Sequence, residues 1–331
     1  GKIVSCWAKN DLMKNRILLG VIFSMVFVAC NNDDDAAPEA DPPLELSEVI
    51  AEDNAEIETF LDTHFYNYEE FASPPADFDF IIDIDTIAGD NSDKTPLSQQ
   101  MERLTINLNS DDLGLDGDET VEHAYYMLRV RERMPDGPKP TTADSTFLKY
   151  EGQLLDGTSF DENQNFTWLE LPFTVRGFAE GASELVAGTS DNIVDNPDGT
   201  VDITDRGIGM VIFPSAMGYF AGGGPSGTIP AYSPLLFKLD IGLFVEDTDR
   251  DNDGIPSILE DLDGNGNLLN DNTDLDSELL TGVILPNFRD ADDDQDGIPT
   301  RDEISDGDGN IIIPYPDSDN DGTPDYLDPD N

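Results

Sequence analysis

Acidic side chains recur at a fixed spacing near the C-terminal end of this 331-residue chain. Asp249, Asp251 and Asp253 alternate before Gly254, and Glu260 follows at the twelfth position of the loop. Alternate carboxylates around a glycine turn, closed by a twelfth acidic residue, supply the oxygen ligands that Ca²⁺ prefers. This loop is therefore predicted to bind a calcium ion.

The same spacing occurs twice more. The second copy has Asp292, Asp294, Asp296 and Glu303, and the third ends on aspartate, with Asp317, Asp319, Asp321 and Asp328. Looser half-sites begin at Asp261 and Asp306. A proline follows each loop glycine by two positions, so the copies resemble thrombospondin type 3 repeats more than paired EF-hands. The pattern predicts structural Ca²⁺ bound to an acidic segment over residues 246–331; the alternative is an acidic disordered tail.

The formal net charge of the chain is -54. Nucleic-acid binding requires basic patches, so nucleic acid is excluded as an expected partner. The charge favours cations as partners, and a secreted or envelope setting in which metals can neutralise the carboxylates. The only cysteines are Cys6 and Cys30, before the expected folded region, which excludes a disulfide framework and thiol catalysis.

Aromatic residues and one carboxylate gather in the segment 147–161. Tyr150 lies in a run typical of a half-buried strand, Asp156-Gly157 indicates a two-residue hairpin turn, and Phe160 with Asp161 ends the return strand. Such a hairpin could form one wall of an apolar pocket that holds a single polar group.

Further elements complete an α+β fold. Apolar spacing predicts a helix over 54–68, capped by Asp53 or Asn54. Alternation predicts strands over 78–84, 104–108, 121–131 and 235–241, and a short helix is expected over 182–186.

The order of motifs between 121 and 245 resembles an FKBP-type peptidyl-prolyl cis–trans isomerase domain. The resemblance implies a twisted antiparallel sheet wrapped on a short helix, with no cofactor for catalysis and proline-containing polypeptides as partners. It also implies a pocket in which Tyr219 and the Val175 amide hold the peptide and Asp161 supplies a dipole. The pocket residues carried over are Tyr150, Phe160, Asp161, Phe166, Val175, Phe178, Tyr219, Ile229 and Phe237.

The chain departs from the family pattern at several points. Phe178 stands where the family has a tryptophan, Thr228 replaces an aliphatic residue, and residues 188–209 contain an insertion with a turn at 195–199. The alternative for the aromatic set is core packing of a twisted sheet. The alternative functions are a non-catalytic peptide-binding or adhesion protein and a calcium-dependent spacer.

The N-terminal region resembles a bacterial lipoprotein leader. Lys14 and Arg16 precede an apolar run that ends at Cys30, the expected lipidation site. This predicts a protein anchored by lipid to the bacterial envelope, at the outer membrane; the alternative is an ordinary signal peptide with an incidental cysteine. The predicted organisation is a signal peptide over 1–30, an acidic tether over 31–43, an extension over 44–112, the isomerase-like domain over 113–245 and the acidic repeats over 246–331. Met13 is the alternative start, which would leave 1–12 untranslated.

Overall fold

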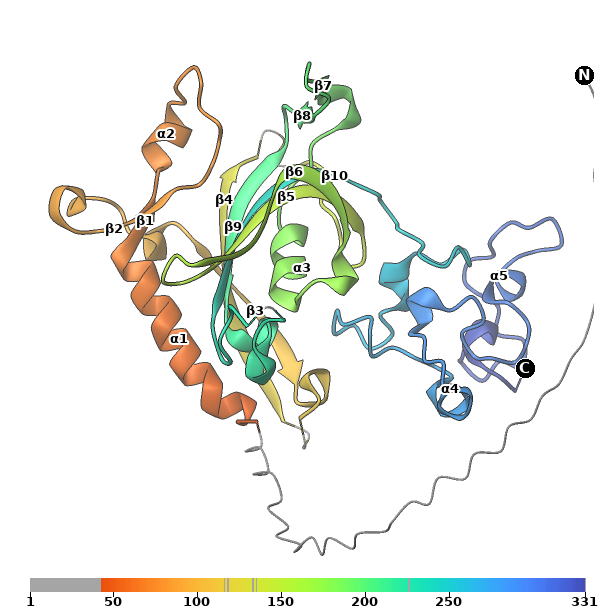
Figure 1. The fold of residues 1–331 in the computed structure, drawn as a ribbon. Coiled ribbons are helices and arrows are strands. Elements are labelled where there is room, and N and C mark those ends of the chain that lie inside the picture. The colour runs from red at the N-terminus through yellow and green to blue at the C-terminus, as the bar shows by residue number, and fades with distance from the viewer. Residues whose placement is uncertain are drawn as a thin grey trace, which may run out of the picture. The chain divides into compact units, whose positions relative to one another are not determined.

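The computed structural model describes residues 43–330 except 116, 118, 133, 135 and 226 (Figure 1). Cys30, the predicted signal peptide and all of the predicted tether except Pro43 lie outside the described residues. In the part of the chain that is described, no helix combines the length and the apolar composition needed to cross a membrane.

A six-stranded antiparallel sheet forms the centre of the fold, with the strand order β3-β4-β9-β10-β5-β6. Its first strand comes from the predicted extension, so that segment and the following one share one sheet. The sheet strands are β3 (Glu102–Asn109), β4 (Thr120–Arg131), β5 (Ser145–Leu154), β6 (Ser159–Glu170), β9 (Gly207–Phe213) and β10 (Leu235–Phe244). The expected combination of helices with an antiparallel sheet is therefore present.

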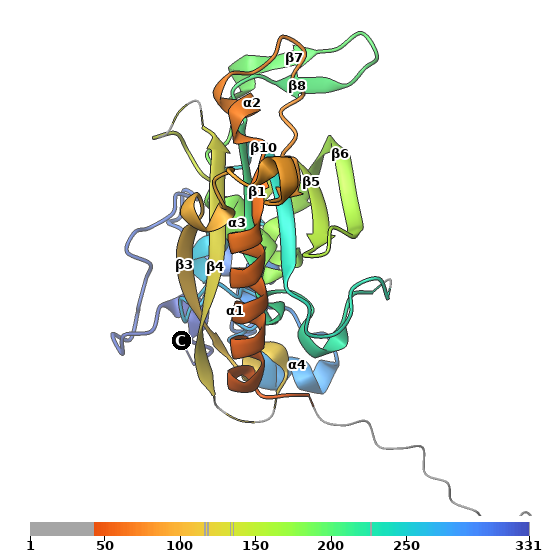
Figure 2. The ribbon, with the colours of Figure 1, turned by 90° about the vertical axis from the view of Figure 1, so that its left-hand side faces the viewer.

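Helices cover both faces of this sheet (Figures 1 and 2). Along β4, Tyr125 and Met127 pack with α3 (Arg176–Ser183), whereas Tyr126 and Leu128 pack with α1 (Leu46–Thr63). Successive side chains of a strand point to opposite faces, so both sets are buried only because each face has a helix. All residues of β9 are buried for the same reason.

Helix α3 lies close to the sheet because glycines face β9. A Cβ on Gly177 would come within 2.2 Å of the Phe213 ring, and one on Gly181 within 2.5 Å of Val211. Larger residues would push the helix away from the strand. Two glycines one turn apart therefore set the depth at which Phe178 enters the core.

The predicted hairpin is present, with a longer turn than expected. The Leu154 N–H donates to the Thr158 carbonyl at 2.9 Å, and the Gly157 N–H donates to the Leu154 carbonyl at 3.0 Å. These bonds enclose a three-residue loop whose last residue, Gly157, has φ of 86°. The expectation of a two-residue turn was wrong, because this loop uses a turn followed by a left-handed glycine.

Three other sequence expectations also change. Helix α1 begins at Leu46 instead of 54 and ends at Thr63, where β1 (His64–Tyr66) starts and pairs with β2 (Ile84–Thr86). Most of 78–84 is irregular, and Phe80 has φ of 64°, which a strand does not allow. The short helix lies at Arg176–Ser183, before the expected 182–186. Helix α2 (Tyr68–Ala72) follows β1.

The insertion over 188–209 contains a small hairpin of its own. Strands β7 (Ile193–Asp195) and β8 (Val201–Ile203) pair antiparallel, and Gly199 at φ of 89° completes the predicted turn.

The three acidic loops share one backbone conformation. The fourth residue of each copy has positive φ, at 67°, 58° and 66° for Asn252, Gln295 and Asn320, and the sixth is a glycine with φ near 100°. The aspartate at the fifth position of each copy accepts a hydrogen bond from the backbone N–H two residues later. The distances are 2.7 Å for Asp253, 2.6 Å for Asp296 and 2.8 Å for Asp321. A small apolar cluster around Ile255, Ile304 and Tyr326 lies among these loops. The same segment contains the short helices α4 (Leu275–Thr281) and α5 (Thr300–Glu303).

Candidate active site and acidic loops

Tyr150 and Asp161 meet at the hairpin between β5 and β6. The Tyr150 hydroxyl donates a hydrogen bond to Asp161 Oδ2 at 3.0 Å. Burial, followed by this hydrogen bond, raises the pKa of Tyr150 to about 12. The tyrosine is therefore a neutral hydrogen-bond donor over the physiological pH range, and Asp161 is its acceptor.

Aromatic rings surround Tyr150 with edge-to-face geometry. The Phe178 ring lies 5.6 Å from that of Tyr150 at 90° and 5.1 Å from that of Phe237 at 89°. The Phe160 and Phe237 rings are 5.4 Å apart at 81°. Phe178 and Phe237 are buried, whereas Phe160 and Tyr150 are partly exposed. The group thus has an aromatic floor with more accessible walls.

Three further predicted residues join the same cluster from other elements. Ile229 is buried, and Tyr219 and Val175 are partly buried against the cluster. Burial and the nearby Asp161 raise the pKa of Tyr219, which keeps its hydroxyl protonated. Val175 is the N-cap residue of α3, and its N–H has no acceptor among the described residues. A carbonyl of a bound peptide could accept from either group.

Phe166 does not join this cluster. Its ring stacks on Phe147 at 5.3 Å, and the Lys149 ammonium lies 4.4 Å from its centre. Between Leu148 and Tyr150 the pairing of β5 with β6 shifts, so Phe166 lies in the unpaired part of β6. Thr167 pairs with Leu148, so strand alternation places Phe166 on the face of Phe147, opposite to that of Leu148 and Tyr150.

Two residues that shape the cluster carry no obvious chemical signal in the sequence. A Cβ on Gly152 would come within 2.5 Å of the Phe160 ring and 2.7 Å of the Phe237 ring, so only glycine leaves room for both. Phe213 is fully buried and stacks on Phe237 at 5.9 Å and 10°. Strand alternation places Phe213 on the inner face, which is the only signal that could have identified it.

A buried carboxylate joins helix α1 to the segment that leads to Tyr219. Asp53 is 2% exposed and accepts from the Ser215 N–H at 2.8 Å and from its hydroxyl at 2.7 Å. Burial raises the pKa of Asp53 to about 6 despite these two bonds. Asp53 lies within α1, so its predicted role as an N-cap is wrong; it binds the start of the 3₁₀ helix Ser215–Met217 instead.

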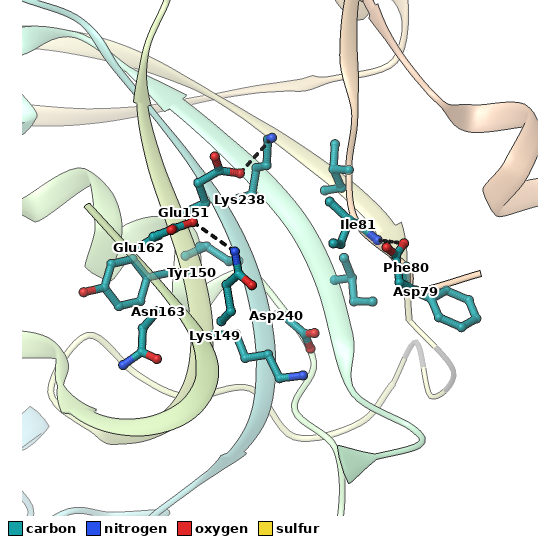
Figure 3. A pocket seen from close by; sticks show the side chains of 14 residues that line it. Asp79, Phe80, Ile81, Lys149, Tyr150, Glu151, Glu162, Asn163, Lys238 and Asp240 are labelled. Atoms are coloured by element: carbon teal, nitrogen blue, oxygen red, sulfur yellow. Dashed lines mark hydrogen bonds and ion pairs between the residues drawn. The ribbon is translucent and has the colours of Figure 1, made fainter. Parts of the chain in front are cut away.

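A cavity of about 270 Å³ lies on the opposite face of β5 and β10 (Figure 3). Lys149, Glu151 and Lys238 line it together with the irregular segment at Ile81, and Lys238 pairs with Glu151 at 3.0 Å. Figure 3 shows the Tyr150 ring pointing away from this cavity. The cavity and the aromatic cluster are therefore separate features on the two sides of one strand pair.

Carboxylate oxygens in the C-terminal segment lie close together in groups of three. Several trios among the described residues place one oxygen per residue within 4.8 Å of the other two, and they include Asp249, Asp251 and Asp253; Asp253, Glu260 and Asp293; Asp261, Asp263 and Asp271; Asp274, Glu278 and Asp290; and Asp292, Asp294 and Asp296. Many of these carboxylates have a buried oxygen with no donor among the described residues, including both oxygens of Glu260. Buried carboxylates without donors are costly unless a cation binds them, so this donor set fits Ca²⁺.

Burial and neighbouring charges also raise the pKa values of carboxylates in the first two acidic loops. Burial, and then the neighbouring Asp251, raise the pKa of Glu260 to about 10. Burial and Asp253 raise the pKa of Asp293 to about 9. In the third loop, Asp319 and Asp321 are exposed, Asp317 and Asp328 are partly buried, and the backbone matches the other two.

Comparison with known proteins shows that part of this chain is similar to several solved structures. No family model matches the sequence, and no curated protein matches it. The peptidyl-prolyl cis–trans isomerase from Pseudomonas syringae pv. tomato is similar at 20% identity and a TM-score of 0.29, over 37% of this chain and 76% of that one. The N-terminal domain of FKBP42 from Arabidopsis thaliana is similar at 18% identity and a TM-score of 0.29, over 37% and 87%.

FkpA from Escherichia coli is similar at 16% identity and a TM-score of 0.31, over 60% of this chain and 62% of that one. This chain thus spans less than two thirds of FkpA. At such identities and TM-scores, the function has to be argued from the residues of the site.

Proposed function

We propose that the chain is a peptidyl-prolyl cis–trans isomerase that assists the folding of envelope or exported proteins. The observation that carries the proposal is the convergence of the predicted pocket residues, apart from Phe166, on one aromatic cluster with a single carboxylate. Those residues come from β5, β6, α3, β10 and the loops near Tyr219 and Ile229, which are separated along the chain.

The chemistry requires no nucleophile. The barrier to rotation about an X–Pro bond is about 18–20 kcal/mol and arises from amide resonance, which water strengthens by stabilising the charge-separated form. An aromatic slot removes water from the amide and favours the twisted state, in which resonance is lost. The Tyr219 hydroxyl and the Val175 N–H would hold the carbonyls of the peptide. Asp161, fixed by Tyr150, would provide the local dipole.

A proline-limited refolding assay tests this function. The purified chain with calcium should accelerate the slow phase, and Asp161→Asn or Tyr219→Phe should reduce the acceleration by about 10-fold, as expected for a lost transition-state contact of about 1.4 kcal/mol. Glu162→Gln is the matched control, because Glu162 is an exposed neighbour with its side chain toward the Figure 3 cavity. Peptide binding without acceleration would contradict catalysis and favour the non-catalytic binding protein.

The acidic segment would bind structural Ca²⁺ through the three loops, with the ligands Asp249, Asp251, Asp253 and Glu260; Asp292, Asp294, Asp296 and Glu303; and Asp317, Asp319, Asp321 and Asp328. The donorless oxygens in the first two loops support this assignment. Lipid attached to Cys30 would anchor the protein to the bacterial envelope, at the outer membrane.

A further inference from the structure

Asp293 occupies an unexpected place in the second acidic loop. It stands between the alternating positions Asp292 and Asp294, so the loop pattern gives it no ligand role. Nevertheless its side chain is 1% exposed. Thr300 Oγ1 donates to its Oδ2 at 3.2 Å, while its Oδ1 has no donor within the described part of the chain.

The side chain of Asp293 lies beside two carboxylates of the first loop. Asp253 and Glu260 are each 1% exposed, and one oxygen of each lies within 4.8 Å of the other and of Asp293. Asp253 Oδ1 accepts the Ile255 N–H at 2.7 Å, and its Oδ2 has no described donor. Neither oxygen of Glu260 has one. One oxygen of each carboxylate thus belongs to the trio, and together the three side chains carry four buried oxygens that accept no hydrogen bond from the described residues.

No side-chain cation in the described chain neutralises this group directly. The nearest candidate is Arg301, whose Nη1 would lie 2.5 Å from a Cβ on Gly254. Burial raises the pKa of Asp253 to about 6, and the charge of Arg301 opposes that rise only in part. However, Arg301 makes no ion pair within 4.0 Å with any described carboxylate. A cation from beyond the described residues would neutralise this group.

We infer that Asp253, Glu260 and Asp293 bind one Ca²⁺ ion that joins the first acidic loop to the second. Ca²⁺–oxygen distances of about 2.3–2.6 Å let ligands on opposite sides of an ion lie nearly 5 Å apart, which the trio satisfies. Ca²⁺ also accepts a bidentate carboxylate, for which Glu260 has both oxygens available, whereas Mg²⁺ retains waters and octahedral geometry.

This site changes the role of Glu260. The loop pattern alone assigns Glu260 to the ion of Asp249 and Asp251. In the structure those two form a separate trio with Asp253, which can bridge two ions. The inference rests on the proposed calcium binding of the repeats and adds a ligand, Asp293, that lies 40 positions after Asp253.

The test compares calcium binding by three versions of the full chain: wild type, Asp293→Asn and Asp302→Asn. Asp302 is an exposed residue of α5, so its variant makes the same change of charge in the same segment. We expect isothermal titration with CaCl₂ to show one ion fewer for Asp293→Asn, or at least a 10-fold weaker ion, with Asp302→Asn unchanged. Equal stoichiometry and affinity in the two variants would overturn the inter-loop site.

Terbium luminescence adds a readout confined to this region. Tyr315 and Tyr326 both lie near Asp253 and Glu260, and Tyr326 also lies near Asp293. Terbium in the site should be excited through these tyrosines, and Asp293→Asn and Glu260→Gln should each reduce the emission while far-UV circular dichroism stays unchanged. Absence of any calcium binding in the wild type would instead overturn the proposed calcium role of all the repeats.

Discussion

Asp53 allows a pH test of the contact between helix α1 and the segment that leads to Tyr219. Its pKa is raised from 3.8 to about 6, first by burial and to a smaller extent by Glu56 and Glu52. The folded state therefore binds this proton more tightly than the unfolded state. Its contribution to stability is fully present below about pH 4 and is lost as the pH rises through about 6. A shift of about two units corresponds to about 3 kcal/mol.

Asp53→Asn keeps an acceptor oxygen for Ser215 and removes the charge. Compared with the wild type, we expect this variant to be nearly equally stable at about pH 4 and up to about 3 kcal/mol more stable at about pH 7.5. Urea unfolding with saturating calcium, followed by fluorescence, measures both values. Glu58→Gln, on an exposed position of the same helix that does not contribute to the pKa shift of Asp53, should show no such change with pH.

Two results would contradict the expected effect of Asp53→Asn. If Asp53→Asn is less stable than the wild type at about pH 7.5, the two hydrogen bonds from Ser215 outweigh the cost of burying the charge. A difference that does not vary with pH would likewise show that Asp53 stays ionised throughout the range.

Two further predictions concern the candidate slot and the acidic loops. Gly152→Ala would place a methyl group 2.5 Å from the Phe160 ring and 2.7 Å from the Phe237 ring, so we expect a loss of about 1–3 kcal/mol in unfolding free energy and loss of peptide binding. Gly222→Ala, with open space around its Cβ, should be neutral in the same urea and binding assays. Removal of calcium with a chelator should expose residues 249–328 to protease, since close carboxylates repel one another. Unchanged cleavage would contradict calcium-dependent order.

Parts of the fold and of the aromatic cluster could be predicted where the spacing of residues along the chain determines the local structure. Strand alternation identified β4 and β10, and the repeated Asp-x-Asp spacing identified loops that share one backbone conformation. Asp53 was assigned to a helix end because aspartate is a common N-cap, yet its partner, Ser215, lies 162 positions away. Local sequence carries no signal for such a distant hydrogen bond.

The remaining errors also come from contacts or irregularities that spacing does not encode. Residues 78–84 alternate like a strand, but Phe80 has positive φ and its ring lies 4.3 Å from the Arg131 guanidinium carbon. Phe166 matches a pocket aromatic in order along the chain. Its neighbour Thr167 pairs with Leu148, however, which places Phe166 on the opposite face of the sheet, beside Phe147. The face that a residue occupies depends on its cross-strand partner, and the spacing within one strand does not identify that partner.

Arg176 connects the candidate slot to the acidic segment. Arg176, next to the N-cap residue Val175, donates through Nη2 to the Asn265 carbonyl at 2.6 Å, and its guanidinium lies on Gly266. That loop belongs to the trio of Asp261, Asp263 and Asp271. A cation that fixes this loop would also fix the first turn of α3, where the Val175 N–H is available. Linkage then requires the reverse: a peptide that orders this turn strengthens cation binding by the same factor.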